Sequence, residues 1–291
     1  MTLPRTDTRV TYATGALEER STVLHVEPVG DRIAVLTEST SVHPVDASWP
    51  DQGADVAEIV IGGRTATIVD CVVGATDGRS LFLGSDIPAR PGDDGWTFVV
   101  AHLVDADSGL NPAEGDEALL RADADTRGTL SIGHTACHLA SLALNRAVAD
   151  RWTKETRLDA LGSPDFDAAA ISSSTIEPFG SVDVFRLNKS LRRKGFTTEG
   201  LTGDLPDLAR AIDAQLSEWI DTAASVTVER DGELLTDLRH WVCDLPGGAA
   251  RIACGGTHVT SLAELGRVTV DLASTTVDGT DILTMTTRAV R

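Results

Sequence analysis

The first 125 residues carry short apolar or alternating runs, separated by Gly, Asp and Pro turn signals. Alternation with a period of two is typical of strands that bury one face in a core. The clearest runs cover residues 22–26, 32–36, 56–61, 65–69, 80–83, 96–104 and 117–122. Many short strands with frequent turns are typical of a small barrel or sandwich. We therefore predict a β-barrel-like N-terminal domain over residues 1–125.

Residues 126–291 mix helical and strand-like patterns. Apolar positions at helical spacing predict one helix from near Gly133 through Trp152 and a second from Leu205 to Ala223, with Pro206 in its first turn. Strand-like runs follow at residues 225–230, 238–243, 250–253, 267–273 and 282–288. Strands that enclose helices in this way favour an α+β domain. The predicted fold class is therefore α+β, with a second domain over residues 126–291.

The composition is strongly acidic, with 44 Asp and Glu residues against 25 Lys and Arg and a formal net charge of −19. Nonspecific affinity for nucleic acid comes largely from phosphate neutralisation, so this charge argues against a DNA-binding protein, although it leaves room for a local basic patch. No apolar run approaches the roughly 20 residues that span a bilayer. The N-terminus also lacks the basic start and apolar segment of a secretory signal. We therefore expect a cytoplasmic protein with no membrane partner.

A first candidate metal-binding motif is His134-Thr135-Ala136-Cys137-His138, in the first predicted helix. Histidines four residues apart lie on one helical face, roughly 5–6 Å apart at Cβ, and can chelate one ion. The motif alone is a weak signal, because paired surface histidines also occur by chance. The residue after His134 is not Glu, so this is not the metalloprotease HExxH helix.

A second candidate motif is Cys254-Gly255-Gly256-Thr257-His258. The chain has four cysteines and no CxxC pair, which argues against a disulfide scaffold or a zinc ribbon. The two glycines permit a turn that folds a thiolate and an imidazole toward one ion. The alternative is a glycine turn that leads into a strand and leaves a buried Cys.

Taken together, the two motifs predict one zinc site made by His134, His138, Cys254 and His258. Three protein ligands with a water molecule would form a hydrolytic site, whereas four protein ligands are typical of a closed structural site. Both interpretations stay open at this point. The other four histidines, His25, His43, His102 and His240, have no partner at ligand spacing.

Both motifs resemble those of the alanyl-tRNA synthetase editing domain. Residues 134–139 are similar to its HTATHL motif, and residues 254–259 match its CGGTHV motif. Asp123 and Arg127 stand where that family has its D-x-x-x-R stretch, and Arg239 and the turn at 245–247 precede the second motif as in the family. The resemblance implies a barrel-like N-terminal subdomain and a freestanding alanyl-tRNA editing protein. It also implies that the four motif residues hold Zn²⁺ and that the protein hydrolyses mischarged Ser- or Gly-tRNA-Ala, in the service of translation fidelity.

Three segments depart from that family. The family's GGGQP segment is replaced by residues 43–53, and its Q-K-G-S segment is absent, with Ser172–Lys194 filling the region. The hydroxyl groups in this stretch either contact an amino acid or are solvated. Cys137 replaces a Thr of the family motif and either faces the metal or packs as a small apolar residue.

The densest basic run consists of Arg186, Lys189, Arg192, Arg193 and Lys194, with no acidic residue between them. Arg and Lys are the side chains that bind phosphates, so we predict this run as a weak tRNA-binding segment. A solvated charged surface is the alternative. Two other functions also stay open for the whole chain: a metal-dependent hydrolase of a non-tRNA ester or amide on the same fold, and a non-catalytic zinc-stabilised binding module.

Overall fold

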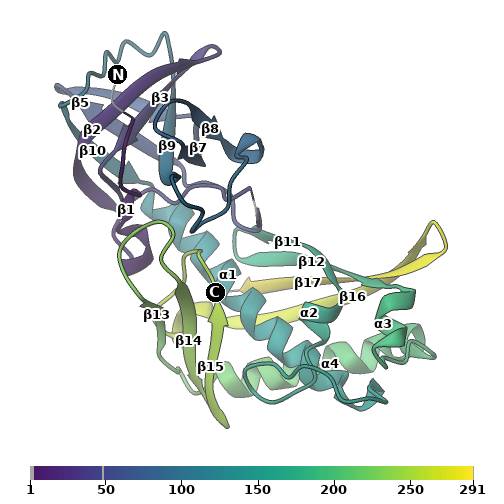
Figure 1. Ribbon diagram of the computed structural model, residues 1–291. Helices are drawn as coiled ribbons and strands as arrows, with labels where there is room; N and C mark the ends of the chain where they lie inside the picture. The colour runs from purple at the N-terminus through teal and green to yellow at the C-terminus, as the bar shows by residue number, and fades with distance from the viewer. Residues whose placement is uncertain (1–2, 48, 291) are drawn as a thin grey trace. The chain divides into compact units, whose positions relative to one another are not determined.

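The computed structural model describes residues 3–47 and 49–290 and shows a mixed α/β fold that is rich in sheet (Figure 1). The described residues form two compact units. Unit 1 contains the chain up to Arg127 together with residues 230–239 and 255–257, and unit 2 contains the rest. Two short segments from the second half of the chain thus belong to unit 1, so neither unit is one continuous stretch of sequence.

The main sheet of unit 1 has eight strands, and every neighbouring pair is antiparallel. Their order is β6 (Arg64–Ile68), β5 (Ala57–Ile61), β10 (Glu117–Ala122), β2 (Glu18–Val29), β3 (Arg32–Thr37), β9 (Thr97–Asp105), β7 (Asp70–Thr76) and β8 (Leu81–Leu83). Val69, directly after β6, donates its N–H to the carbonyl of Leu103 in β9 at 2.8 Å. The sheet therefore curls into a half-barrel. A short parallel pair, β1 (Arg9–Val10) with β4 (Ser39–Thr40), and the 3-10 turns η1 (Tyr12–Thr14) and η2 (Gly84–Asp86) accompany it.

The long apolar run in β9 arises because this strand is buried on both faces. Phe98 and Val100 point into the larger core of unit 1, whereas Val99, Ala101 and Leu103 point into a second, smaller apolar cluster. Strand β5, in contrast, buries alternate residues, as expected for a strand with one core face. The predicted strand-rich character of this part of the chain is confirmed.

Unit 2 contains four helices and two sheets among its described residues. The helices are α1 (Ala124–Ala147), whose first turn belongs to unit 1, α2 (Phe166–Ala170), α3 (Lys189–Arg193) and α4 (Leu201–Ile220), with 3-10 turns η3 (Ala149–Arg151) and η4 (Leu262–Leu265). One sheet has the order β11 (Ile171–Glu177), β12 (Gly180–Leu187), β17 (Thr280–Val290) and β16 (Arg267–Val277). The other has the order β13 (Val226–Arg230), β14 (Arg239–Leu245) and β15 (Gly248–Ala253).

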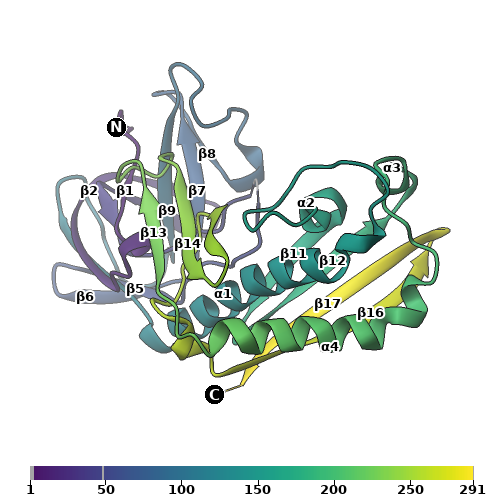
Figure 2. The ribbon, with the colours of Figure 1, turned by 90° about the horizontal axis from the view of Figure 1, so that it is seen from below.

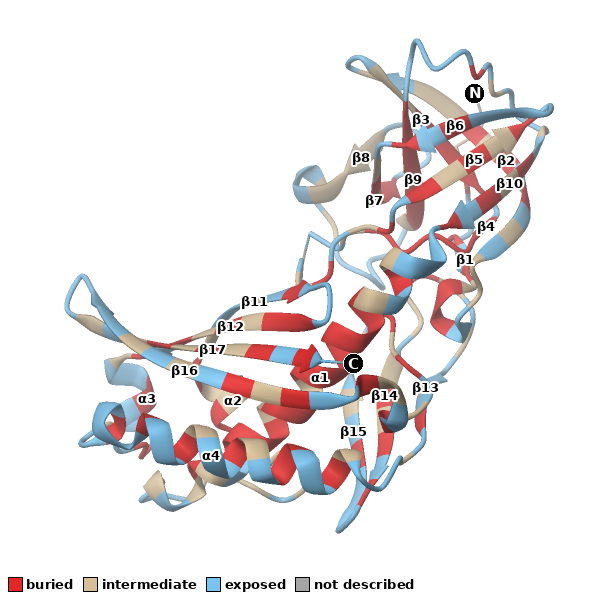
Figure 3. Ribbon diagram, turned by 180° about the vertical axis from the view of Figure 1, so that it is seen from behind, coloured by how far each residue is buried: buried red, intermediate tan, exposed pale blue. Residues whose placement is uncertain are grey.

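The core of unit 2 lies between the four-stranded sheet and helices α1 and α4 (Figure 2). Leu283 and Met285 of β17 are buried in the same cluster as Leu139 of α1 and Ile212 of α4. Helix α4 accordingly has one buried face and one exposed face (Figure 3). None of the helices in the described part of the chain is long and apolar enough to cross a membrane.

The helix boundaries differ from the predicted ones. Helix α1 begins at Ala124 rather than near Gly133, because Asp123 accepts a hydrogen bond from the N–H of Thr126 at 2.8 Å and so caps the helix. Helix α4 begins at Leu201, which is 3% exposed, so Pro206 lies inside the helix instead of in its first turn. The buried face of α4 thus already includes Leu201, ahead of the proline on which the predicted start was based.

Candidate metal centre

Four side chains with metal-binding atoms lie together in unit 2: His134, His138, Cys254 and His258. Their candidate ligand atoms all lie within 4.8 Å of one another. Cys254 Sγ is 3.3 Å from His134 Nε2 and 3.2 Å from His258 Nε2. Two ligand atoms of a tetrahedral zinc ion are roughly 3.4–3.7 Å apart. The residues of the two sequence motifs are therefore brought together, in a group of the size that one metal ion requires.

A glycine on α1, next to His134, sets how closely the helix approaches the turn between β11 and β12. A Cβ atom added to Gly133 would lie 2.3 Å from the carbonyl oxygen of Glu177 and 2.5 Å from that of Gly180, where β11 turns into β12. Only glycine permits so close an approach between the helix and the backbone of the turn. His134, the next residue, is 1% exposed.

Thr135 orients the imidazole of His258. Its Oγ1 lies 3.2 Å from His258 Nδ1 and accepts a hydrogen bond from the N–H of Val259 at 3.3 Å. If Nδ1 carries the proton and donates it to Thr135, the Nε2 lone pair of the neutral ring faces Cys254. A hydrogen bond at the remote nitrogen is the usual way in which proteins fix the tautomer of a metal-ligating histidine.

His138 gives the clearest indication that these residues fit a metal ion. Its buried Nε2 has no hydrogen-bond partner among the described residues. The Trp241 ring of β14 lies against its imidazole, with ring centroids 5.1 Å apart. Burial lowers the pKa of His138 to about 4, so the ring is neutral at pH 7 and keeps a lone pair available. A buried polar atom without a partner is costly, and bonding to a metal ion would remove that cost.

The donor atoms indicate a transition-metal ion but do not specify which one. Three imidazoles and one thiolate are an ordinary ligand set for zinc. Imidazole also binds copper, iron and nickel, so the structure shows a group that can hold a metal without selecting which one.

The thiol of Cys137 points to a carboxylate outside this group. Its Sγ lies 3.5 Å from Asp183 Oδ1. Asp183 is 1% exposed and also accepts hydrogen bonds from Ser174 Oγ at 2.6 Å and Ser181 Oγ at 2.8 Å. Burial raises the pKa of Asp183, and the serine hydroxyls oppose that rise. Two hydroxyl groups of the serine-rich segment thus contact this carboxylate, and the pairing of Cys137 with Asp183 has no signal in the sequence.

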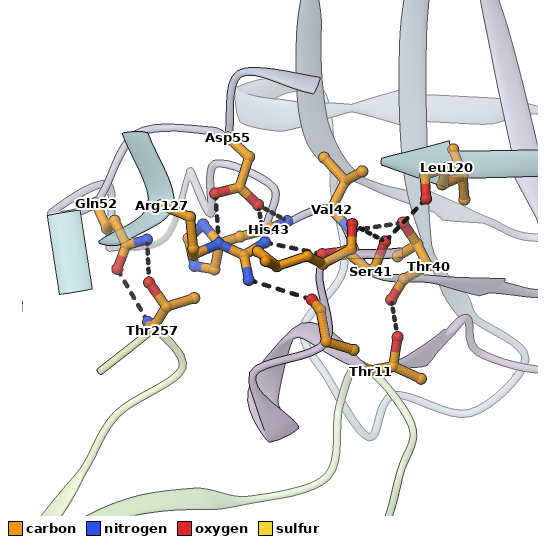
Figure 4. Close-up of polar contacts among 12 residues, drawn as sticks. Thr11, Thr40, Ser41, Val42, His43, Gln52, Asp55, Leu120, Arg127 and Thr257 are labelled. Carbon is orange, nitrogen blue, oxygen red and sulfur yellow. Dashed lines mark hydrogen bonds and ion pairs between the residues drawn. The ribbon is translucent and has the colours of Figure 1, made fainter. Parts of the chain in front are cut away.

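In unit 1, the segment 43–53 makes a contact that the sequence analysis missed. Gln52 is 1% exposed, and its side-chain amide binds Thr257 twice: Nε2 donates to Thr257 Oγ1 at 3.0 Å, and Oε1 accepts from the Thr257 N–H at 3.0 Å (Figure 4). Thr257 directly precedes His258 in the chain. The only available signal was the presence of a Gln in a segment that replaces the family's glutamine-containing loop.

A buried ion pair lies beside this contact in the same unit. The Nε and Nη2 atoms of Arg127 donate to the two carboxylate oxygens of Asp55, with Nε to Oδ1 at 2.7 Å, and Nη2 also donates to the carbonyl of Ser41 (Figure 4). Asp55 additionally accepts the N–H of His43. Arg127 and Asp55 are each 5% exposed, so this pair ties the start of α1 to the segment 41–55 within unit 1.

The remaining histidines lie outside the metal-binding group. His102 is buried and bonds Thr40 Oγ1 at 2.8 Å and the Val35 carbonyl at 3.0 Å. His25 contacts Glu27 and Glu114, and His240 contacts Arg251. His43 is buried against the ring of Tyr12. Burial lowers the pKa of both His43 and His102 to about 4.

The residues of the basic run lie at the end of β12 and on α3. Arg186, Lys189, Arg192, Arg193 and Lys194 are all exposed. Arg192 Nη1 donates to the carbonyl of Leu187 at 2.8 Å. The run therefore forms a surface of unit 2 and contributes nothing to its core.

Comparison with known proteins relates the sequence of this chain to one class of enzyme. No protein-family model matches the chain. It is 26% identical over 247 residues to the alanine–tRNA ligase of Akkermansia muciniphila, covering 84% of this chain and 22% of the ligase. It is 31% identical over 154 residues to the ligase of Frankia casuarinae, covering 53% of this chain and 15% of the ligase. It is 30% identical over 176 residues to the ligase of Ruegeria pomeroyi, covering 58% of this chain and 18% of the ligase.

The chain thus contains a domain related to part of alanine–tRNA ligases. It spans about a fifth of the length of these relatives or less.

Proposed function

We propose that the chain is a zinc-dependent hydrolase that deacylates mischarged aminoacyl-tRNA, namely Ser- or Gly-tRNA-Ala, in trans. The observation that carries the proposal is the convergence of His134, His138, Cys254 and His258 on one point. The relation to part of alanine–tRNA ligases supports tRNA as the substrate class. In the reaction, water adds to the ester carbonyl, the bond to the 3′-terminal ribose breaks, and a free amino acid and tRNA are released.

The chain's own residues would hold and shape the reaction site. The four motif side chains would hold the ion. Thr135 keeps the His258 ring in one orientation, and Trp241 lies against His138. A bound zinc ion polarises a carbonyl group or lowers the pKa of a bound water molecule.

The principal test is a deacylation assay with Ser-, Gly- and Ala-tRNA-Ala. The zinc-loaded protein should release serine or glycine and leave alanine attached. The variant His134→Ala should lose roughly 100-fold or more of this activity, because it removes one donor of the group. The variant His240→Ala is the matched control, since His240 lies outside the group, and it should keep the activity. Equal hydrolysis by wild type and His134→Ala would overturn the proposal.

The number of ligands favours one competing function. Four protein donors are typical of a closed, structural zinc site, which would make the chain a zinc-stabilised binding module. In that case the protein would contain one equivalent of zinc and hydrolyse none of the three aminoacyl-tRNAs. A hydrolase of a non-tRNA ester or amide would likewise fail on all three and still cleave a small aminoacyl ester.

A further inference from the structure

All three lysines of the sequence lie in one region of unit 2, together with three arginines. We call the six side chains the α3 surface: Lys154, Arg186, Lys189, Arg192, Arg193 and Lys194. All six are exposed. Five of them belong to the basic run around α3, and the sixth comes from a different segment of the chain.

Helix α3 holds the surface in a defined position although it is short. Asn188 caps its start by accepting the N–H of Leu191 at 2.9 Å. At its end the N–H of Phe196 reaches the carbonyl of Leu191 and the N–H of Gly195 reaches that of Arg192, which is a Schellman arrangement. Leu191 and Phe196 are buried, at 1% and 2% exposed. The apolar side chains therefore anchor the helix while its basic side chains face solvent.

The tertiary structure adds Lys154 to this surface. Lys154 Nζ donates to the carbonyl of Arg193 at 3.0 Å, and the neighbouring Thr153 N–H donates to the carbonyl of Gly195 at 2.9 Å. Gly195 has φ 107°, and a Cβ atom there would lie 2.8 Å from Lys154 Cβ. Glycine at this position thus lets the lysine stem lie directly against the end of α3.

Within the part of the chain that the structure describes, the six cations form no ion pair. Among the described residues, no carboxylate lies within ion-pair distance of any of them, whereas Arg151, Arg157 and Arg288 in the same unit each contact an Asp. Glu155 directly follows Lys154, and Asp183 and Glu199 are the first acidic residues on either side of the basic run in the sequence. A chain with 44 acidic residues has ample carboxylates for local pairing. A cluster that forms no such pairs is complementary to an external polyanion.

We infer that the α3 surface binds the sugar-phosphate backbone of tRNA, with Lys154 as one of its phosphate contacts. The identity of the polyanion rests on the proposed function. Lys and Arg side chains bind phosphates without reading bases. Phe185 and Phe196, which flank the basic run in the sequence, are both buried and offer no stacking platform. The surface therefore contributes affinity and orientation, and it does not select the amino acid that is removed.

The test measures binding of fluorescently labelled, uncharged tRNA-Ala by anisotropy at several salt concentrations. The triple variant Lys189→Ala, Arg193→Ala, Lys194→Ala should bind about tenfold more weakly or worse. The slope of log affinity against log salt should fall in magnitude by roughly two to three, because each lost phosphate contact removes about one released counterion. Lys154→Ala alone should reduce the slope by about one.

A charge-matched control distinguishes the effect of the α3 surface on tRNA binding from the effect of the lower net charge. Arg90, Arg230 and Arg267 are exposed and pair with no carboxylate in the described part of the chain. Their triple alanine variant has the same net charge as the test variant and should bind as the wild type does. An equal loss in both triple variants, or no loss in the test variant, overturns the inference. Because the probe carries no amino acid, a failure of deacylation leaves this binding result standing. If deacylation is normal and the test variant binds tRNA as the wild type does, only the role of the α3 surface in tRNA binding is overturned.

Discussion

At the scale of single residues, Gln52 contacts the residue that directly precedes a candidate metal ligand. Its amide donates to and accepts from Thr257, and both side chains are buried. Two hydrogen bonds to one residue hold both its backbone and its hydroxyl group. Since Thr257 precedes His258 in the chain, the clamp restricts the backbone that leads into one candidate ligand.

We predict that Gln52→Met weakens Co²⁺ binding by about tenfold and changes the visible spectrum of the bound ion, because the loop before His258 loses both hydrogen bonds. Gln52→Glu should restore the spectrum. A glutamic side chain can accept the Thr257 N–H and share a hydrogen bond with its hydroxyl in either protonation state.

Ser41→Ala provides the matched control for this pair, because Ser41 is a buried polar residue of the same unit whose hydroxyl bonds Leu17 and Leu120. It should lower thermal stability without altering the Co²⁺ spectrum. If Gln52→Met and Ser41→Ala change the spectrum alike, Gln52 has no specific positioning role.

At the scale of secondary-structure elements, α1 carries two glycines with opposite roles. A Cβ atom at Gly128 would meet nothing within 4 Å, whereas one at Gly133 would collide with two backbone carbonyls of the β11–β12 turn. Glycine lowers helix stability wherever nothing requires it. Only the second glycine is therefore required by packing.

We predict that Gly128→Ala stabilises the protein by roughly 0.5–1 kcal/mol through helix propensity. Gly133→Ala should destabilise it by about 1–3 kcal/mol, because a backbone carbonyl cannot move aside as a flexible side chain can. Urea unfolding of both variants measures the two free energies. Similar effects of the same sign would contradict the close packing of α1 on the turn.

At the scale of the whole molecule, the free energy of unfolding depends on buried groups whose pKa differs between the folded and unfolded chain. His43 and His102 have a pKa of about 4 when folded, against an ordinary value of 6.5, because burial penalises the charged ring. The unfolded chain therefore takes up protons first as the pH falls from 6.5 toward 4, and stability is lost across that window. Asp167 acts in the opposite direction, because burial raises its pKa to about 6.

We predict that His102→Asn reduces this loss of stability by roughly 2 kcal/mol between pH 7 and pH 5. The asparagine amide can still donate to the Val35 carbonyl, so much of the local hydrogen bonding is kept. Unfolding by urea at a series of pH values gives the free energy of unfolding, and its slope against pH, for the wild type and the variant. If the slope of the unfolding free energy against pH is unchanged in His102→Asn, His102 does not account for the predicted loss of stability.

Local patterns in the sequence determined the strand-rich character of the first part of the chain and the composition of both metal-binding motifs. Histidines four residues apart in a helix share a face, and glycines between Cys254 and His258 permit a turn, whatever the rest of the chain does. Alternating apolar runs likewise predicted strands such as β5, because side chains alternate between the faces of a sheet, and a continuous apolar run predicted the buried β9.

Tertiary structure alone decided which distant residues meet. Gln52 clamps Thr257 across 205 positions, Cys137 contacts Asp183 across 46, and Lys154 joins α3 across 39. None of these pairs has a spacing that sequence periodicity can reveal, because each depends on how separate elements pack together. The close approach permitted by Gly133 is of the same kind: sequence shows a glycine in a helix, and only the packed turn shows why a side chain cannot replace it.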